Sequence, residues 1–439
     1  MEGLTDVRLK LFRRFLIIRL VLSFVLDYWK IGRLKKRLQG EQLKKAVNQV
    51  HTNAGIRMRL TAFRLKGVIV KIGQFLSMRQ DLLPEAFTKE LMDLVDALPA
   101  APFSQIEVLI QKELKQKAHK LFKQFDEQAI AAASLAQVHR ATLMDGSVVA
   151  VKIIRPGMER LAKADLDSLG LAAKLVRRIP SIHRRLDFVQ MHREFTETIQ
   201  RELDCRQELL HLQRFTEMFA HHSRIKIPKV YEPYTTRRIL VMEYIEGIRI
   251  TDQQKLRECG IDEVSTAKTL LESYLRQLLV SGFVHVDPHP GNLFVLLDGR
   301  LCFLDFGMMD ELSTREVQTF RRLVQSILLN DPNGVLHALK QLGFLPPSYS
   351  AAELKPLLDQ VVSKLFGKEH TGAEMNSLLS IFHNSPIQLQ AKYMFIMRGI
   401  GFLITTLGIL APHTNWLEWL FDMGLSMFNT SIQTNEDNV

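Results

Sequence analysis

Three side chains between residues 285 and 307 have the types and spacing needed to handle a metal ion and a phosphate group. Asp287 and Asn292 lie in one short segment, and Asp305 opens an Asp-Phe-Gly triplet further along. Phosphoryl transfer needs one carboxylate near the acceptor, while an Asn and a second Asp hold Mg²⁺ against the phosphate oxygens. The segment therefore predicts Asp287 as a catalytic residue and Asn292 and Asp305 as metal ligands.

A lysine upstream is suited to neutralising the phosphates of a bound nucleotide. Lys152 ends the run Val149-Ala150-Val151-Lys152, which matches the strand-borne lysine of protein kinases. Kinases carry a glycine-rich loop roughly 15–20 residues before this lysine. Here the corresponding place holds four small residues, Ala131, Ala132, Ala133 and Ser134. Alanine enters tight turns less freely than glycine, so we expect the phosphates to approach this backbone in a restricted way.

Two other interpretations of the loop that contains Asp287 are open at this point. His285, Asp287 and His289 alternate along the chain, and such side chains can bind a divalent ion in a metal hydrolase. That interpretation leaves Asn292 and Asp305 unexplained. In the second interpretation the histidines are merely structural.

The basic excess of the chain lies entirely in the segment 1–79. This segment holds 18 lysines and arginines against four acidic residues, a balance of +14, whereas the whole chain carries +11. The remainder is therefore slightly acidic. A localised basic segment indicates an anionic lipid surface or a nucleic acid. Nucleic acid is disfavoured, because no basic patch interleaved with aromatic residues accompanies the charge.

Residues 11–29 combine long apolar runs with arginines. This pattern is typical of an interfacial amphipathic helix, and an arginine near the centre disfavours a transmembrane helix. We expect Arg13, Arg14 and Arg19 to meet lipid headgroups, with the protein held peripherally on the cytoplasmic face of a membrane. The alternative is a helix packed on the protein's own body with a solvated basic face.

Helical patterns fill most of the chain, and pairs of β-rich runs interrupt them. The expected strand pairs are residues 138–143 with 148–154, 229–232 with 239–244, and 294–297 with 301–304. Residues 158–219 predict a long helical region. The apolar stretch 399–411 is too short to span a bilayer, so it predicts a core helix. This order of elements predicts an α+β fold with two lobes.

Composition and cysteine usage fit an ordinary globular protein. The chain has 439 residues, of which 46% are hydrophobic and 24% charged, and these values exclude a disordered or collagen-like chain. The three cysteines lie far apart and form no CxxC pair. Neither a disulfide framework nor a zinc knuckle is therefore expected, which suits a reducing compartment.

Several motifs together resemble the UbiB-like (AarF-domain) atypical kinases, a family linked to isoprenoid-quinone metabolism. The resemblance covers roughly residues 55–415. The motifs that carry it are Lys71-Ile72-Gly73-Gln74 with Ser77, Arg79, Asp81 and Pro84, the alanine-rich loop with Gln137-Val138-His139, Lys152 with Arg155-Pro156-Gly157, Glu202-Leu203-Asp204 with Glu208, Met242-Glu243-Tyr244, and the segments around Asp287 and Asp305.

The resemblance implies a two-lobed protein-kinase-like fold with a family-specific N-terminal helical extension. The expected segments are a basic amphipathic membrane-contacting segment at 1–45, the helical extension with its KxGQ motif at 46–125, a kinase-like N-lobe with inserted helices at 126–247, and a helical C-lobe with the catalytic loop and DFG at 248–430.

The resemblance also implies roles for individual residues. Lys152 is implied to contact phosphates and to pair with Glu208. The nucleotide-binding residues are implied to be Ala131, Ala132, Ala133, Ser134, Lys152 and the hinge residues Met242, Glu243 and Tyr244. The implied regulatory residues are Lys71 and Gln74 of the extension with the acidic pair Glu202 and Asp204, which Lys71 is implied to reach.

These observations predict an atypical kinase or ATPase that uses ATP or ADP with Mg²⁺ and supports quinone or related isoprenoid-lipid biosynthesis at a membrane surface. Its expected partners are nucleotide, an anionic membrane, a lipid or quinone precursor and quinone-biosynthesis proteins, with no nucleic acid. The alternatives are a conventional protein kinase and a nucleotide-binding, pseudokinase-like regulator or assembly factor.

Overall fold

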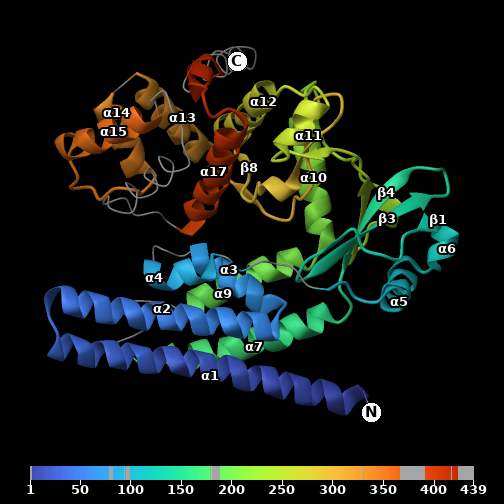
Figure 1. Cartoon of the computed structure of the whole chain (residues 1–439), viewed down its shortest axis with the longest axis horizontal. Coiled ribbons are helices and arrows are strands. Elements are labelled where there is room, and N and C mark those ends of the chain that lie inside the picture. The colour runs from blue at the N-terminus through green and yellow to red at the C-terminus, as the bar shows by residue number, and fades with distance from the viewer. Residues whose placement is uncertain are drawn as a thin grey trace. The chain divides into compact units, whose positions relative to one another are not determined.

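The computed structural model describes residues 2–78, 83–92, 94, 99–177, 179, 188–329, 331–365, 391–416 and 418–423, so Arg79 and Asp81 lie outside the described residues. The chain divides into two compact units. Unit 1 contains residues 1–209 and 229–244, and unit 2 contains residues 210–228 and 245–439 (Figure 1). Each unit combines helices with β-strands, which confirms the α+β class. The finer division into four segments stays a prediction.

Helices of four to 36 residues form one part of unit 1. They are α1 (Glu2–Arg37), α2 (Gly40–Leu65), α3 (Val68–Met78), α4 (Glu85–Thr88), a 3-10 turn (Lys89–Leu91), α5 (Phe103–Leu114), α6 (Ala118–Leu121), α7 (Met158–Arg177), α9 (Phe188–Glu202) and α10 (Cys205–Met218), whose last residues belong to unit 2. Helix α1 packs against α2 and α7, and α7 packs against α9 (Figure 1).

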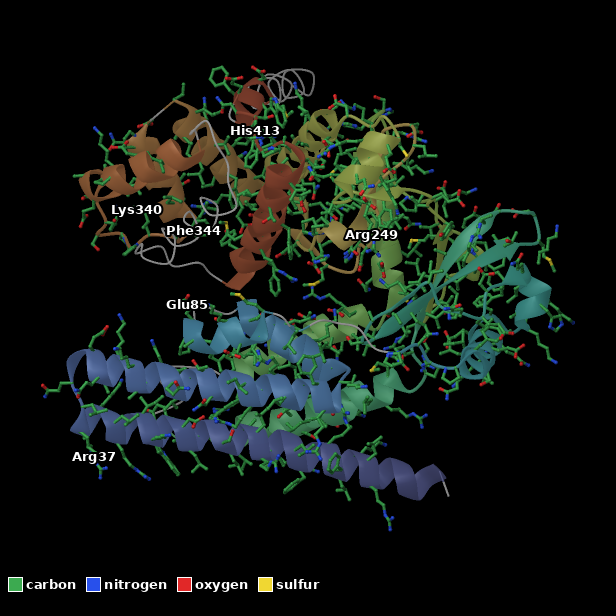
Figure 2. The ribbon with its side chains drawn as sticks, in the orientation of Figure 1. Arg37, Glu85, Arg249, Lys340, Phe344 and His413 are labelled. Carbon is green, nitrogen blue, oxygen red and sulfur yellow. The ribbon has the colours of Figure 1, made fainter. Side chains whose placement is uncertain are left out.

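Helix α1 contains the predicted helix of residues 11–29 and buries one of its faces. Arg13 lies on this inward face, where Nε and Nη2 donate to the Asp165 carboxylate at 2.9 and 2.5 Å and Nη1 donates to the Leu65 carbonyl at 2.6 Å. The expectation that Arg13 meets lipid headgroups is therefore wrong. A guanidinium on the inward face must be paired, because an isolated buried charge is costly. Arg14 and Arg19 are exposed, as is Arg37 at the end of the helix (Figure 2).

An antiparallel sheet forms the rest of unit 1. Its strands are β1 (Phe122–Phe125), β2 (Ala131–Ala132), β3 (Ala136–Leu143), β4 (Val148–Ile154) and β6 (Ile239–Glu243), in the order β1-β3-β4-β6 with β2 on β3. The predicted hairpin of 138–143 with 148–154 is confirmed as β3 and β4. The predicted pairing of 229–232 with 239–244 is confirmed over a shorter length: Val230 bridges Met242 in the antiparallel sense, and the Tyr231 and Glu243 amides donate to the Val241 and Lys229 carbonyls at 2.8 and 2.7 Å. The run then enters a 3-10 turn (Glu232–Tyr234). Pro233 lies in that turn and has no N–H to donate to a ladder.

Alternation along β4 places Lys152 away from the core of the sheet. Val149, Val151 and Ile153 are buried and pack with side chains of β6 and α5. Successive side chains of a strand point to opposite faces, so Lys152 lies on the other face, opposite Leu240 of β6 in the register.

Short strands and a helical layer form unit 2. The strands are β5 (Ile225–Lys226), β7 (Ile248–Arg249), β8 (Phe283–His285), β9 (Leu293–Val295), β10 (Leu301–Phe303) and β11 (Met309–Glu311), ordered β5-β10-β9-β7 and β11-β8. The helices are α11 (Gln253–Glu258), α12 (Glu263–Arg276), α13 (Thr314–Leu328), α14 (Pro332–Gln341), α15 (Ala351–Leu365) and α17 (Ala391–Leu410). The predicted hairpin around Asp298-Gly299 is confirmed as β9 and β10.

A glycine directs the chain from helix α12 to the loop that contains Asp287 in unit 2. Helix α12 continues into a π turn (Gln277–Ser281), and Gly282 follows with φ of 68°. A Cβ at this position would lie 2.8 Å from the Leu312 carbonyl oxygen and from Val317 Cγ2. Both the left-handed backbone and the close approach therefore require glycine. Strand β8 begins at the next residue and ends shortly before Asp287.

Helix α17 contains most of the apolar stretch 399–411. Leu403, Leu407 and Leu410 are buried in unit 2, which confirms the prediction of a core helix. Across the described part of the chain, no helix combines the length and the apolar character that crossing a membrane requires.

Candidate active site

Strand pairing brings the catalytic-loop residues of unit 2 close to the DFG triplet. Strand β8 pairs with β11 so that His285 faces Met309, and β9 pairs with β10 so that Leu293 faces Phe303. The Leu304 amide donates to the Asn292 carbonyl at 3.0 Å, which places Asn292 beside Asp305. The sequence motif is therefore assembled by two short ladders.

His285 joins Asp287 to Asp305 through backbone groups. Its Nε2 is 2.5 Å from the Asp305 carbonyl oxygen, and its Nδ1 lies 3.3 Å from the Asp287 amide nitrogen. A carbonyl can only accept and an amide can only donate, so Nε2 carries the proton and the imidazole is neutral. Complete burial lowers the pKa of His285, which favours the same state.

The metal-hydrolase interpretation does not fit this geometry. Both ring nitrogens of His285 are already occupied by the backbone, so neither can bind a metal ion. No group of three or more His, Cys, Asp and Glu side chains in the described part of the chain is arranged to hold a metal. For His285, the structural interpretation is the correct one.

Asn292 and Asp305 provide oxygen donors suited to Mg²⁺. Both side chains are half-buried, and Asp305 Oδ1 accepts a hydrogen bond from the Gly307 amide at 2.9 Å. One amide and one carboxylate match the small number of protein ligands that Mg²⁺ takes when phosphates and water complete its shell. The residues present thus fit a nucleotide-bound magnesium ion.

Residues of α10 that belong to unit 2 hold the DFG phenylalanine. The Phe306 ring is buried and lies 5.1 Å from the Phe215 ring, and His211 Nδ1 is 2.9 Å from the Phe306 carbonyl oxygen. Sequence reasoning missed His211. Its only signal is helical spacing, one turn after Glu208.

Arg398 of α17 is a second residue that sequence reasoning missed. Its Nη2 lies 3.2 Å from Asp287 Oδ1. A signal was present, because Arg398 directly precedes the apolar stretch 399–411, and a charged residue on a core helix needs a partner.

In unit 1, Lys152 and Glu208 form the ion pair that the family resemblance implies. Lys152 Nζ lies 2.8 and 2.7 Å from the two carboxylate oxygens of Glu208, which occupies the first turn of α10. Burial raises the pKa of the neighbouring Cys205 thiol to about 12, and the Glu208 charge adds to this effect. Cys205 is therefore a neutral packing residue beside the pair.

The alanine-rich loop is a tight hairpin between β2 and β3. Ala131 faces Val138, Ala132 faces Gln137, and the Ala133 amide donates to the Ala136 carbonyl at 2.8 Å. Arg155 donates to the Ala133 carbonyl at 3.2 Å. None of residues 131–136 has a positive φ, so alanine and Ser134 fit without strain. The Ala133 amide is already paired and is unavailable to a phosphate.

The predicted hinge residues end strand β6 of unit 1. Met242 is buried, the Glu243 amide donates to the Lys229 carbonyl at 2.7 Å, and the Tyr244 amide donates to the Val148 carbonyl at 3.1 Å. The Arg140 guanidinium lies 5.1 Å from the centre of the Tyr244 ring.

The helical extension contacts one member of the predicted acidic pair. Lys71 Nζ of α3 lies 3.1 Å from Glu202 Oε2 of α9. Asp204 is bound instead by Arg206 at 2.7 Å and approached by Arg237 at 3.8 Å, so the expectation that Lys71 also reaches Asp204 is wrong. Hydrogen bonds from Arg206 lower the pKa of Asp204. Gln74 donates to the Leu94 carbonyl at 3.1 Å and packs within the extension.

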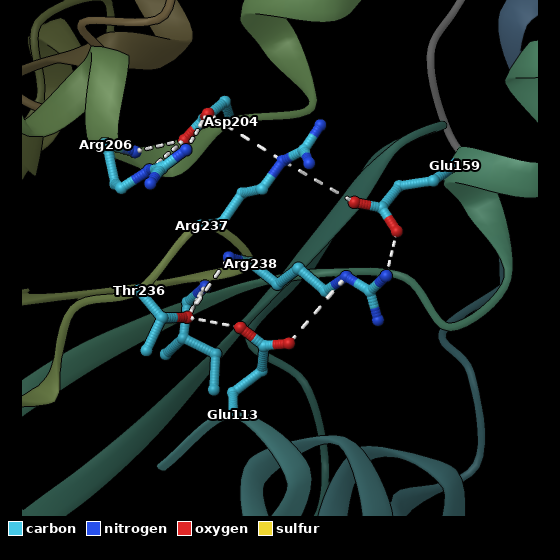
Figure 3. A network of polar contacts seen from close by, with 8 residues as sticks. Glu113, Glu159, Asp204, Arg206, Thr236, Arg237 and Arg238 are labelled. Atoms are coloured by element: carbon cyan, nitrogen blue, oxygen red, sulfur yellow. Dashed lines mark hydrogen bonds and ion pairs between the residues drawn. The ribbon is translucent and has the colours of Figure 1, made fainter.

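An ion-pair network around Asp204 positions the start of α10 in unit 1 (Figure 3). Arg237 lies between Asp204 and Glu159, each at 3.8 Å, and Arg238 pairs with Glu159 and with Glu113. The Cys205 amide donates to the Arg237 carbonyl at 2.9 Å. The network therefore ties the N-terminus of α10, and with it Glu208, to the segment that enters β6.

Comparison with known proteins identifies relatives along most of the chain. A profile described as an ABC1 atypical kinase-like domain matches residues 93–339. The probable protein kinase UbiB of Marinobacter nauticus is 33% identical over 72% of this chain and 59% of that protein. The chloroplastic protein ACTIVITY OF BC1 COMPLEX KINASE 7 of Arabidopsis thaliana is 32% identical over 79% of this chain and 51% of that protein.

Two further matches extend this similarity. An uncharacterized protein of Synechocystis, slr1919, is 31% identical over 85% of this chain and 66% of that protein. The chain thus spans about half to two thirds of the length of these curated relatives. The solved structure of Rv3197 of Mycobacterium tuberculosis in complex with erythromycin superposes with a TM-score of 0.58 at 25% identity, covering 84% of this chain and 93% of that one.

Proposed function

The chain belongs to the ABC1 atypical kinase-like family, and from that premise we propose that it binds ATP or ADP with Mg²⁺ and transfers the terminal phosphoryl group of ATP. The observation that carries this proposal is the chain of contacts that joins Asp287, Asn292 and Asp305 in unit 2. Four groups that phosphoryl transfer requires are present, because Lys152 with its partner Glu208 completes the set.

Each of these residues has a distinct task in the proposed reaction. The oxygen of the acceptor hydroxyl bonds to the γ-phosphorus while the bond between that phosphorus and the ADP oxygen breaks. Asp287 accepts the proton that this hydroxyl loses. Lys152, held by Glu208, contacts the phosphates. Asn292 and Asp305 hold Mg²⁺, which when bound neutralises negative charge on the phosphate oxygens.

Nucleotide binding provides the first test. Replacing Asp305 with Asn should weaken Mg-ATP and Mg-ADP binding by about tenfold or more, because a carboxylate on the metal is lost. Asp298→Asn, in the exposed turn between β9 and β10, is the matched control. Calorimetric titration in excess Mg²⁺ measures both variants. Equal affinity in wild type and Asp305→Asn contradicts the metal role of Asp305.

Two features support slow phosphoryl transfer to proteins, in contrast to a conventional protein kinase. The Ala133 amide is paired within its hairpin, and Lys71 binds the extension to α9 through Glu202. We propose that the hairpin restricts the nucleotide and the extension restrains the acceptor. With radiolabelled ATP, Ala133→Gly should increase self-phosphorylation. A wild-type protein that readily labels generic protein substrates, with no gain in Ala133→Gly, supports the conventional protein kinase.

The outward face of α1 supports peripheral membrane contact. Leu11, Phe15, Leu22, Leu26 and Trp29 recur at helical spacing and are each between 49% and 61% exposed. Exposed basic residues flank them, namely Arg14, Arg19, Lys30 and Arg33. An apolar stripe bordered by cations suits the boundary between anionic headgroups and acyl chains.

Co-sedimentation with vesicles tests this contact. The double variant Phe15→Ser, Leu22→Ser should lose binding to anionic phospholipid vesicles, and about 0.5 M salt should weaken wild-type binding, as expected when the Debye length falls below about 5 Å. Leu297→Ser, a strongly exposed residue of a turn in unit 2, is the control. Undiminished binding of the double variant contradicts the proposal.

We propose that the acceptor belongs to quinone or related isoprenoid-lipid metabolism, with a lipid or quinone precursor and quinone-biosynthesis proteins as partners. The support is the motif resemblance to the UbiB-like kinases together with the apolar face of α1. Comparing quinones and their precursors in cells with and without the protein tests this assignment. Unchanged levels, with nucleotide binding intact, favour a pseudokinase-like regulator of another process.

A further inference from the structure

Helix α17 places a cation against the residue proposed to accept the proton. Arg398 lies far from Asp287 along the chain, yet its Nη2 is 3.2 Å from Asp287 Oδ1. Among the described residues, this is the ion pair that Asp287 makes. Both side chains are partly accessible, 29% for Arg398 and 27% for Asp287.

The two oxygens of Asp287 are in different environments. Oδ1 is buried and accepts no hydrogen bond within the described structure, so the Arg398 charge is what compensates it there. The accessible area of the side chain therefore lies on its remaining atoms. A carboxylate held by one oxygen leaves the other, Oδ2, to face an acceptor hydroxyl.

The reach of Arg398 is fixed by close packing of α17 on the catalytic loop. A Cβ at the next residue, Gly399, would lie 3.2 Å from the His285 carbonyl oxygen, closer than most side chains tolerate. One turn further, the Phe402 ring packs edge-on against His289 at 5.4 Å. The same ring lies 5.1 Å from the Arg398 guanidinium. Loop, glycine and ring together hold the arginine in place.

We propose that Arg398 is a positioning residue for Asp287. Its guanidinium fixes Oδ1 on the protein side, so that Oδ2 is the oxygen that takes the proton of the acceptor. This inference rests on the proposed phosphoryl transfer and deepens it, because it assigns the orientation of the proton acceptor to a helix outside the catalytic motif.

Kinetics of ATP turnover test the positioning role. Arg398→Met should lower kcat by about tenfold or more, since small misplacements of a reacting group are costly. The KM for Mg-ATP should change by less than about threefold, because Arg398 acts on the acceptor side. Arg398→Lys should recover part of kcat. The matched control is Arg257→Met, which removes the Arg257–Glu263 pair of the same unit, at 3.1 Å, and should leave kcat unchanged.

A double-mutant cycle separates positioning from general support of the fold. If Arg398 acts through the Asp287 carboxylate, adding Arg398→Met to Asp287→Asn should lower kcat no further. Independent losses that multiply overturn the positioning role. The melting temperatures of both variants give a second criterion. The positioning role is also overturned if Arg398→Met has a lowered melting temperature that by itself accounts for its loss of kcat, while Arg257→Met melts at the wild-type temperature.

Chemical modification tests the contact without relying on turnover. The rate at which phenylglyoxal modifies Arg398, read by mass spectrometry after digestion, should rise severalfold in Asp287→Asn, while the rate at Arg257 stays constant. An unchanged rate at Arg398 overturns the pairing. A wild-type protein without any turnover, but with the expected change in modification, instead contradicts the proposed function and the positioning role with it, while the contact stands.

Discussion

Two arginine–aspartate pairs anchor helices at distant positions in the chain, and they differ in how well their charges are satisfied. Arg13 of α1 and Asp165 of α7 are almost completely buried, at 6% and 0% exposed, and are joined by two hydrogen bonds, with a third from Arg13 to a carbonyl. Arg398 of α17 and Asp287 are partly exposed, and Asp287 Oδ1 accepts no hydrogen bond within the described structure.

The difference shows how the same residue types serve structure and chemistry. A fully buried pair with complete hydrogen bonding is costly to break, because the survivor is left as an unpaired charge. A partly exposed pair with spare bonding capacity contributes little to stability and leaves an oxygen available for reaction. Arg13–Asp165 therefore orients α1, whereas the proposed task of Arg398–Asp287 is to orient a reactive group.

The largest expected contrast is in turnover. Asp287→Asn should lower kcat for ATP by roughly 10²–10⁴, the usual contribution of a general base. Asp165→Asn should leave the kcat of the folded protein within about twofold, since only the packing of α1 is affected. Steady-state assays corrected for the folded fraction by circular dichroism compare them. Similar losses of kcat in both variants would contradict the division into a structural pair and a catalytic pair.

Stability should show the opposite contrast. Arg13→Met should lower the free energy of unfolding by about 3–5 kcal/mol, because Asp165 remains buried without its partner. Arg398→Met should lower it by about 1 kcal/mol or less, because Asp287 can turn toward water. Urea titration measures both values. A loss in Arg398→Met as large as that in Arg13→Met indicates a structural role for the second pair.

The Lys71–Glu202 pair should fall between these two. Its side chains are 23% and 14% exposed. Lys71→Ala should therefore loosen α3 from α9 by about 1–3 kcal/mol. Hydrogen exchange of the α3 amides measures this opening. Arg206→Ala is the control, because Arg206 binds Asp204 and not Glu202. If the α3 amides also exchange faster in Arg206→Ala, Asp204 must be counted among the partners of Lys71.

Mild acid should produce the smallest change in the free energy of unfolding, through His285, which contacts the backbone of Asp287 and Asp305. Burial lowers the pKa of His285 below its ordinary value of 6.5. Between the folded-state pKa and the ordinary value the unfolded chain binds more protons, so stability is lost as pH falls through this window, by at most about 1.4 kcal/mol per pH unit. His285→Gln should show a shallower slope in urea unfolding as pH is lowered from neutral into the mildly acidic range. Parallel slopes contradict a neutral buried imidazole.

Local patterns predicted the strand pairs whose partners are close in sequence. The pairs β3–β4 and β9–β10 are hairpins with short turns around Gly146 and Gly299, and turn residues between β-rich runs are a strong local signal. The run 229–232 had a similar composition but pairs with β6 only briefly, because it enters a 3-10 turn at Glu232 and Pro233 has no N–H to extend the ladder. The other edge of β6 pairs with β4 across the long inserted helical region. Composition alone does not specify a partner at that separation.

The amphipathic N-terminal segment was only half interpretable from its sequence. Long apolar runs with interspersed arginines predicted a helix, and α1 confirms it. The pattern did not indicate that Arg13 faces inward while Arg14 and Arg19 face outward, because apolar residues occur all around this helix. The face of α1 that turns inward is decided by Asp165 on α7, whose buried carboxylate binds Arg13.

The residues proposed to carry the reaction could be identified from residue types and spacing without a fold. Asp287, Asn292 and Asp305 fall within a span short enough for one loop and one hairpin to assemble them, and Lys152 follows from its β-rich run. The partners that orient these and the neighbouring acidic side chains became visible only in the folded chain. Arg398 reaches Asp287 from a remote helix, and Arg237 approaches Asp204 from the segment that enters β6. Such pairs depend on which helix faces meet, and that information is carried by packing between remote segments and not by spacing along the sequence.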